Sequence, residues 1–293
     1  MNDFRTAKLA VTGASGHLGR RVVELLLEGG ATNVVAITRD ADKLADFAKR
    51  GVEVRQASFD NPASLVTGFA GIDRLLIIST DSLAARTEQQ AAAVEAAEAA
   101  GVKHIVYTSL TSPYPDPAAL IPNSHFWTEV RIASGTANWS ILRNNQYTDY
   151  LIPGAQNAIA TGTLFHAGAT GGRAYVTRED CAAAAAGALL KAEGKRIYNI
   201  GGPAALSGDD LATLYSQLSG KPITAQNVPA EGLKAGLRQA GVPPEMADAL
   251  TIFDTDTAKG YLGIVTADVA ELSGRPAQSV ADFLTANRAA LGA

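Results

Sequence analysis

The sequence predicts an α/β fold, in which a doubly wound parallel sheet is followed by a smaller C-terminal lobe. Short apolar runs alternate with longer helical patterns from Lys8 to about Leu142. A glycine-rich turn follows the first of these runs, and past Tyr150 the alternation is interrupted by Pro153 and several glycines. Because the runs are apolar on both faces, we expect strands in the middle of a sheet with helices on either side.

Six strands and five helices are expected in the first half of the chain. The strand-like runs cover residues 8–12, 33–38, 52–55, 74–78, 104–107 and 139–142, and the helical patterns cover about 18–28, 41–50, 62–68, 84–100 and 122–135. Strict alternation of this kind is typical of parallel βαβ units.

The alternation stops in the second half. Glycines and Pro153 interrupt the chain there, and helices are expected near 207–219 and 229–240. We therefore expect one domain over residues 1–150 and a smaller lobe over 151–293, with some of the later chain returning to the main domain.

Composition restricts the class of function. The chain has 25 Lys and Arg against 29 Asp and Glu, so it offers no basic field for a nucleic acid. Four scattered histidines give no metal-ligand spacing, and no metal is expected. The single cysteine, Cys181, lies in an alanine-rich run and is interpreted as a small buried residue.

The N-terminal residues pass directly into a strand-like run without an apolar signal region, and no stretch is long enough to span a membrane. We expect a cytoplasmic protein with no membrane span.

The glycine-rich turn is the clearest functional signal. Gly13, Gly16 and Gly19 follow the first strand at spacings of three, and a helix is expected from Leu18. Glycines at these places permit a tight turn and a close approach of the backbone to a pyrophosphate, which the N-terminus of the helix attracts. The spacing has one residue more than the G-x-G-x-x-G fingerprint, but the strand before and the helix after favour a Rossmann-type dinucleotide site.

Arg39 decides which dinucleotide is expected. It stands about 20 residues past the turn, at the end of the second strand, where a cation accepts the 2′-phosphate of NADP(H). Asp40 follows directly and, being one residue further on, is expected to point elsewhere. The sequence therefore favours NADP(H) over NAD(H).

On these residues the chain resembles the NmrA-like branch of the atypical short-chain dehydrogenases and reductases. Within that branch it is most similar to the type-2 NADPH:quinone oxidoreductases and the triphenylmethane dye reductases. Besides the glycine turn, the likeness is carried by residues 75–79, 101–109, 128–129, 142–144, 147–149, 178–180 and 198–200. It covers nearly the whole chain.

The resemblance implies a set of cofactor-binding residues. Gly13, Ala14, Ser15, Gly16, His17 and Leu18 would hold the pyrophosphate, and Arg39 would meet the 2′-phosphate. The path from adenosine to nicotinamide would be lined by Ser79, Thr80 and Asp81. The segment that would run beside the nicotinamide consists of Asn144, Asn145, Gln146, Tyr147, Thr148 and Asp149. Two segments depart from the family pattern, Ser79–Asp81 and the proline-rich Pro113–Pro117.

The chain lacks the machinery of an ordinary alcohol dehydrogenase of this superfamily. None of its eight tyrosines has a lysine four residues later, and no lysine occurs between Lys103 and Lys191. Such a lysine lowers the pKa of the catalytic tyrosine. Hydride transfer to a quinone or a cationic dye needs less acid–base chemistry, because the product anion or neutral product is already stable and water or a neutral tyrosine can supply a proton.

The candidate catalytic residues are Tyr147, Asn144 and His125. Tyr147 and Asn144 fall just beyond a strand end, where ligands bind in open parallel sheets, although Tyr147 could equally be a buried anchor. His125 is expected at a helix start, in a capping or packing role or in contact with substrate. Glu129 is expected to pair with Arg143 rather than act as a base.

Three further residues have open roles. Tyr107 is a candidate orienting group, and Phe126 and Trp127 would either wall an apolar acceptor pocket or pack between the lobes.

The leading hypothesis is an NADPH-dependent reductase that transfers hydride to a quinone or a similar delocalised electrophile. One alternative keeps NADPH and changes the acceptor to an aromatic ketone or an activated alkene. Another is a non-enzymatic NADP(H) redox sensor of the NmrA type. The expected partner is a small aromatic or quinone-like molecule, and the protein is expected to be a monomer or a homodimer.

Overall fold

The computed structural model describes residues 4–292. These residues form two compact units. The first contains the chain up to Arg143 together with Glu179–Ile200 and Asp268–Arg275. The second contains Asn144–Arg178, Gly201–Ala267 and the chain from Pro276 onward. Each unit is therefore assembled from segments that lie far apart in the sequence.

The first unit is built on a seven-stranded sheet with the order β3-β2-β1-β4-β5-β6-β8. The strands are β1 (Leu9–Val11), β2 (Val34–Thr38), β3 (Glu53–Gln56), β4 (Arg74–Ile77), β5 (His104–Leu110), β6 (Asn138–Asn144) and β8 (Lys195–Ile200). The neighbours among β3, β2, β1, β4 and β5 pair in parallel. Because β1 lies between β2 and β4, the strand order reverses there, and the predicted doubly wound sheet is confirmed.

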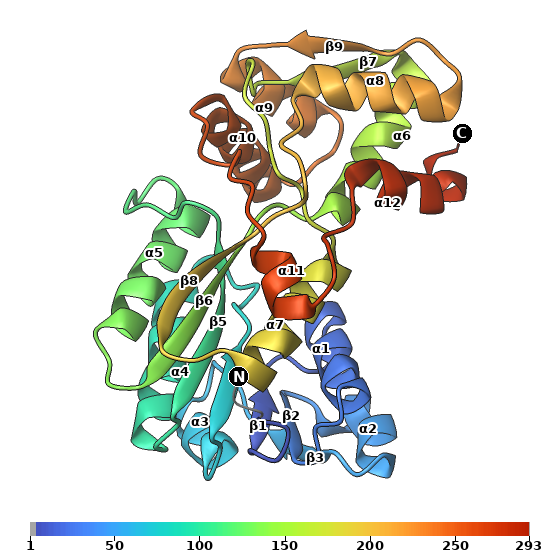
Figure 1. Ribbon diagram of the computed structural model, residues 1–293. Helices are drawn as coiled ribbons and strands as arrows, with labels where there is room; N and C mark the ends of the chain where they lie inside the picture. Colours follow the sequence, from blue (N-terminus) through green and yellow to red (C-terminus); the bar gives the residue numbers. More distant parts are fainter. Residues whose placement is uncertain (1–3, 293) are drawn as a thin grey trace. The chain divides into compact units, whose positions relative to one another are not determined.

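Helices cover both faces of this sheet (Figure 1). They are α1 (His17–Glu28), η1 (Ala41–Leu44), α2 (Ala45–Lys49), α3 (Pro62–Phe69), α4 (Arg86–Ala99), α5 (Leu120–Ala133), α7 (Arg178–Lys191) and α11 (Asp268–Ser273). Ala93 and Ala97 of α4 are wholly buried in one apolar cluster with Leu75 of β4 and Ile105 of β5. Small side chains on α4 thus let the helix lie close to the sheet.

Alanine has the same effect in α7. Cys181 is 1% exposed, and Ala182, Ala184 and Ala185 beside it are completely buried. A Cβ on Gly187 would lie 1.9 Å from the carbonyl oxygen of Leu272 in α11, so the two helices touch through backbone. The interpretation of Cys181 as a small buried residue is confirmed.

The second unit contains a two-stranded parallel sheet of β7 (Thr163–His166) and β9 (Thr224–Asn227). Its helices are η2 (Thr148–Tyr150), α6 (Leu151–Thr161), α8 (Gly208–Ser219), α9 (Ala230–Gln239), α10 (Pro244–Ala258), α12 (Val280–Ala286) and η3 (Arg288–Leu291). The apolar core joins Ala155 and Ala158 of α6, Leu211 and Tyr215 of α8, and Leu284 of α12.

The element boundaries agree with the sequence-based prediction to within a few residues, with one change of type. The expected helix at 41–50 is a 3₁₀ turn, η1, followed by the short α2. The carboxylate of Asp40 accepts a hydrogen bond from the Asp42 N–H at 3.2 Å and so begins η1. Among the residues described, none of the helices has both the length and the hydropathy that crossing a membrane requires.

Candidate nucleotide and acceptor site

The turn between β1 and α1 has the backbone geometry that its glycines permit. Gly13 adopts φ +61°, in the left-handed region that favours glycine. A Cβ on Gly19 would lie 2.3 Å from the carbonyl oxygen of Gly13 and 2.9 Å from the Cα of Ala14. Gly13 therefore makes the turn, and Gly19 lets α1 pack directly against it.

The N-terminus of α1 leaves N–H groups open. Gly16 is the N-cap and provides no side-chain cap, and no acidic residue lies in the first turn. The amides of His17 and Leu18 open the helix and have no carbonyl partner within it. By contrast, the Ala14 N–H donates to the carbonyl of Ile37 at 3.0 Å, so Ala14 fixes the turn to β2 and its amide is already used.

A cavity of about 410 Å³ opens beside this turn at the carboxyl ends of β1, β2 and β4. Seven of the predicted cofactor residues line it, namely Gly13, Ser15, Gly16, Arg39, Ser79, Thr80 and Asp81. Ala14, His17 and Leu18 are not among the lining residues. We call this space the nucleotide cavity.

Several lining residues were missed by the sequence analysis: Lys43, Phe59, Asp60, Ser82 and Gln89. Lys43 lies in η1, and Phe59 and Asp60 follow the end of β3. The sequence does contain a signal for the residues after β3. The carboxyl ends of parallel strands meet at one edge of the sheet, so polar residues after β3 are expected at the same edge as Arg39.

Two cations line the cavity next to β2. The side chain of Arg39 is exposed, and within residues 4–292 no protein group forms an ion pair or hydrogen bond with its guanidinium. Lys43 lies in the same wall, 3.8 Å from the Asp40 carboxylate. Asp40 itself caps η1 and is not among the lining residues, as expected. This end of the cavity can therefore hold a phosphate.

The part of the cavity near the end of β3, which we call the slot, has an apolar lining and two polar side chains. Ile37, Ala57, Phe59 and Leu65 provide its apolar wall. Gln89 donates its Nε2 hydrogen to Asp60 Oδ1 at 2.6 Å, while its buried Oε1 has no hydrogen-bond partner. A buried acceptor without a partner is costly, so an N–H donor on a ligand would satisfy it. The amino group of an adenine is such a donor.

The segment after β4 is fixed to its neighbours. The Ile78 N–H donates to Thr12 Oγ1, and the Ser79 N–H donates to Thr108 Oγ1, both at 2.9 Å. These bonds hold Ser79 and the following Thr80 at the switch point between β1 and β4, where ligands bind in this class of sheet.

His125 lies in the second turn of α5 and does not cap it, which corrects the expectation of a position at the helix start. It is buried between Tyr107 and Arg86, with Nδ1 2.7 Å from the Tyr107 hydroxyl and Nε2 3.4 Å from an Arg86 nitrogen. Burial, together with the Arg86 charge, lowers the pKa of His125 to about 3. The ring is therefore neutral near pH 7.

The charges around His125 also decide its tautomer. Arg86 has only donors, so His125 Nε2 accepts its hydrogen, and Nδ1–H donates to Tyr107 Oη. Desolvation raises the pKa of Tyr107 well above its usual value. Neither side chain is arranged to release a proton near neutral pH.

Glu129 is held by its neighbours. Arg143 donates to both carboxylate oxygens, at 3.0 and 2.6 Å, and Ser109 Oγ donates to Oε1 at 2.6 Å. The expected ion pair with Arg143 is confirmed, and both carboxylate oxygens accept hydrogen bonds.

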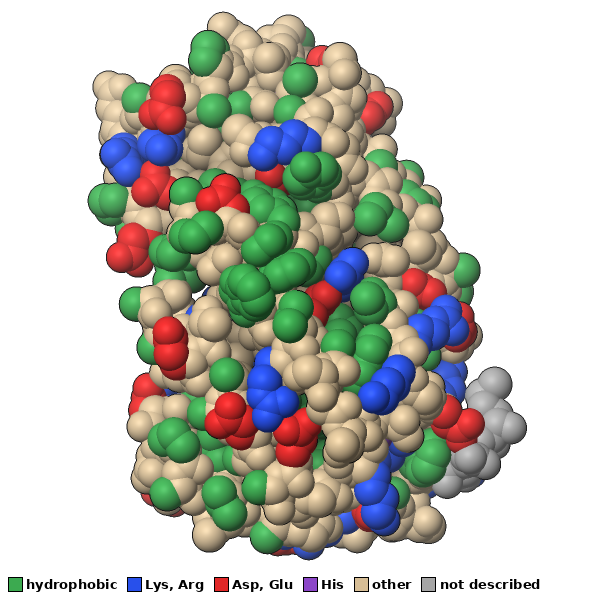
Figure 2. All heavy atoms as spheres, turned by 90° about the vertical axis from the view of Figure 1, so that its left-hand side faces the viewer, with side chains coloured by type: hydrophobic (Ala, Val, Ile, Leu, Met, Phe, Trp, Pro, Cys, Tyr) green, Lys and Arg blue, Asp and Glu red, His purple; other side chains and the backbone are tan. Residues whose placement is uncertain are grey.

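The aromatic residues of α5 are only partly covered. Trp127 is 48% exposed and meets Phe126 edge to face, with ring centroids 5.2 Å apart. Leu120 and Val130 of the same helix are also exposed, and Figure 2 shows hydrophobic side chains on the side of the molecule where α5 lies.

The predicted nicotinamide segment, Asn144–Asp149, begins the second unit and is tightly anchored there. Asn145 Nδ2 donates to the Leu262 carbonyl at 2.9 Å, the Thr148 N–H donates to the Val176 carbonyl at 2.9 Å, and Arg178 pairs with Asp149 at 3.1 Å. Within residues 4–292 the buried Oδ1 of Asn144 has no hydrogen-bond partner. The backbone is thus fixed, while one buried amide oxygen is left unsatisfied by the described protein.

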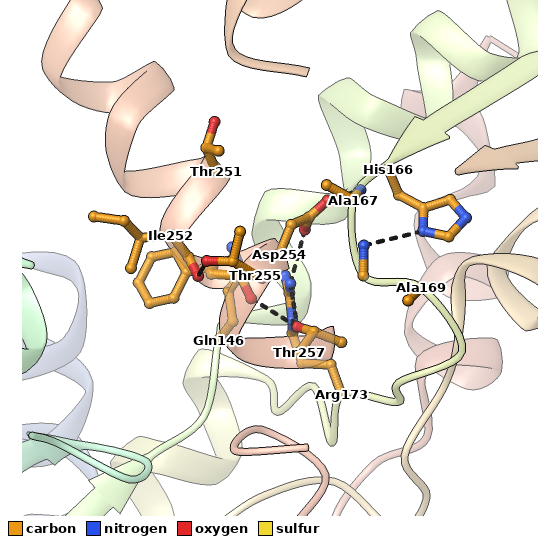
Figure 3. A network of polar contacts seen from close by, with 12 residues as sticks. Gln146, His166, Ala167, Ala169, Arg173, Thr251, Ile252, Asp254, Thr255 and Thr257 are labelled. Carbon is orange, nitrogen blue, oxygen red and sulfur yellow. Dashed lines mark hydrogen bonds and ion pairs between the residues drawn. The ribbon is translucent and has the colours of Figure 1, made fainter. Parts of the chain in front are cut away.

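Gln146 is held by the buried Arg173 (Figure 3). Arg173 also donates to Thr257 Oγ1 and, at 2.8 Å, to Asp254 Oδ1. The second Asp254 oxygen accepts the Ala167 N–H at 2.8 Å. Arg173 therefore joins the segment after β6 to the end of α10.

Taken together, the reversed strand order, the glycine turn and the phosphate-binding end define a Rossmann-type dinucleotide-binding protein. The chain belongs to the NAD(P)H-binding family, whose model matches residues 13–192.

Comparisons of sequence and of structure extend this likeness over nearly the whole chain. Quinone oxidoreductase 2 of Escherichia coli is 35% identical over 280 residues, which cover 94% of this chain and 97% of that protein. The structure of the NADPH-dependent quinone oxidoreductase of Escherichia coli with NADPH superposes with a TM-score of 0.89 at 33% identity, covering 95% and 99% of the two chains. Triphenylmethane reductase of Citrobacter sp. with NADP(H) gives 0.85 at 30% identity, covering 96% and 99%. The resemblance inferred from the sequence is confirmed.

Proposed function

We propose that this chain is an NADPH-dependent reductase that transfers hydride to quinones and similar delocalised electrophiles. The observation that carries the proposal is the nucleotide cavity, whose lining includes the glycine turn and the exposed Arg39 at the end of β2. The full-length likeness to an NADPH-dependent quinone oxidoreductase supports the acceptor class.

The residues of the cavity fit NADP(H) part by part. Gly13, Ser15 and Gly16, at the N-terminal end of α1, would hold a pyrophosphate, since the N-terminus of a helix attracts negative charge. Arg39 and Lys43 bind the 2′-phosphate, and the slot with Asp60 and Gln89 takes the adenine. When bound, NADPH supplies the hydride.

The protein orients the nicotinamide and the acceptor rather than transferring a proton. His125 is neutral and buried, Glu129 is paired, and the chain has no tyrosine with a lysine four residues on. Asn144, whose buried Oδ1 has no hydrogen-bond partner within residues 4–292, and Tyr147 remain our candidates for orienting the nicotinamide and the acceptor. Quinones suit such a site because the product anion is stable and solvent can protonate it. The cytoplasmic location and the monomeric or dimeric state remain predictions from the sequence.

The first test is NADPH oxidation by benzoquinone, followed by nicotinamide absorbance, in wild-type protein and in Arg39→Ser. Loss of a charge-assisted phosphate contact is expected to raise the KM for NADPH about 10- to 100-fold, with the KM for NADH nearly unchanged. Arg50→Ser, at an exposed arginine outside the cavity, is the matched control.

Failure of wild-type protein to oxidise NADPH with any of several quinones would overturn the proposal. If it then bound NADPH and NADP⁺ with comparable affinity, the redox sensor would be the better description. Equal use of NADPH and NADH would remove the assignment of Arg39.

A further inference from the structure

A pair of tyrosines lies just after the end of β6 in the second unit. The rings of Tyr147 and Tyr150 stack with centroids 5.9 Å apart and planes 21° from parallel. The guanidinium carbon of Arg178 lies 5.2 Å from the centroid of each ring. Tyr150 is 57% exposed. We call these three side chains the tyrosine platform.

A β-bridge and several hydrogen bonds hold the tyrosine platform in place. Tyr147 pairs with Val176 in an isolated parallel bridge, and the Thr148 N–H donates to the Val176 carbonyl at 2.9 Å. Asp149 accepts from Arg178 Nη1 at 3.1 Å and from the Arg178 backbone N–H at 3.3 Å. Because Asp149 balances the charge of Arg178, the arginine serves the platform as a flat, fixed support for the rings.

The platform lies where a ligand is expected. Tyr147 comes three residues after Asn144, the last residue of β6, and three residues span about 10 Å at most. Ligands of open parallel sheets bind just outside the carboxyl ends of the strands. An aromatic ring more than half exposed at such a place offers a stacking surface to a ligand.

We propose that the tyrosine platform binds the acceptor, by stacking the exposed ring of Tyr150 on a flat, electron-poor ring system. The inference rests on the proposed function and names the substrate class that this site selects. Phenol rings are electron-rich, and quinones are flat and electron-poor, so stacking between them is favourable. Acceptors with two or more fused rings cover more of Tyr150 than benzoquinone and gain more from it.

The experiment compares benzoquinone with naphthoquinone in wild-type protein, Tyr150→Ala and Tyr150→Phe. Tyr150→Ala is expected to raise the KM for naphthoquinone about tenfold, and that for benzoquinone less, with kcat within about twofold and NADPH affinity unchanged. Tyr150→Phe keeps the ring and is expected to behave like wild type. Phe165→Ala, at an aromatic residue of β7 that is 49% exposed, is the control for loss of an exposed ring in the same unit.

The two proposals fail separately. Unchanged quinone KM values in Tyr150→Ala, with normal wild-type turnover, overturn the platform and leave the reductase intact. If wild-type protein shows no turnover, calorimetric binding of naphthoquinone to wild type and Tyr150→Ala decides the matter, because equal affinities then overturn the platform as well.

Discussion

Gly19 is a position where the addition of one atom, a Cβ, is incompatible with the packing of α1 against the turn after β1. A Cβ at this position would lie 2.3 Å from the Gly13 carbonyl oxygen. Gly19→Ala must therefore push α1 away from the turn and displace the turn residues Gly13, Ser15 and Gly16, which line the nucleotide cavity. We expect a loss of about 1–3 kcal/mol in the free energy of unfolding and a weaker NADPH affinity.

Gly236→Ala is the matched control for this change. Gly236 lies within α9, and nothing stands within 4 Å of its added Cβ. Alanine there should stabilise the helix by about 0.5–1 kcal/mol. Denaturant titration and NADPH binding measure both variants, and a Gly19→Ala protein that binds NADPH as wild type does would refute the assignment.

At the same scale, the sequence predicts the residues of the site that have a motif and misses those that depend on the fold. Gly13 and Arg39 stand at fixed positions relative to strands that the apolar pattern already marks. Gln89 could not be found in this way. It lies three residues into a helix whose alanines suggest only packing, and its role depends on its contact with Asp60, 29 positions earlier.

At the scale of elements, one arginine fixes the C-terminus of α7. The guanidinium of Arg74, at the start of β4, donates to the carbonyls of Leu189, Ala188 and Ala192 at 2.7, 2.9 and 2.6 Å. Desolvation lowers the pKa of Arg74 to about 10, so it is still charged at neutral pH. A cation suits the end of a helix, where carbonyls carry partial negative charge.

Arg74→Met is therefore expected to cost about 3 kcal/mol, because buried carbonyls lose charged donors. Urea unfolding followed by the fluorescence of Trp127 and Trp139, the two tryptophans of the chain, reports on the first unit. Arg50→Met, which removes only an exposed contact with the Phe47 ring, should cost less than about 1 kcal/mol. Equal losses in the two variants would contradict the proposed role of Arg74.

The elements that the sequence did not predict lie mainly in the second unit. Pro153 and Gly154 were interpreted as interruptions, yet both lie in the first turns of α6. Proline is tolerated there because the first amides of a helix need no carbonyl partner within it. Strands β7 and β9 have four residues each and pair only with one another, so their patterns are too short to be recognised.

At the scale of the whole molecule, two buried histidines make stability depend on pH. His104 is buried with its Nε2 2.9 Å from Ser140 Oγ, and His125 is buried beside Tyr107. Burial, with a neighbouring arginine in each case, lowers the pKa of both rings to about 3. In the unfolded chain both pKa values return to about 6.5.

The sign of the effect follows from these values. Above about pH 6.5 both states hold neutral histidines, and the full stability is present. As the pH falls from about 6.5 towards 3, only the unfolded chain takes up the two protons, so the folded state loses stability. Each histidine contributes about 1.4 kcal/mol per pH unit, so about 4 kcal/mol is lost by pH 5.

Urea titrations between about pH 7.5 and 5, followed by tryptophan fluorescence, test this dependence. His104→Gln should be less stable at neutral pH but should show about half the wild-type slope, since one of the two titrating rings is gone. Gly236→Ala, which leaves both buried rings in place, is the control and should keep the full slope. If His104→Gln keeps the wild-type slope, the pH dependence arises from other groups, and the burial of neutral His104 does not govern acid stability.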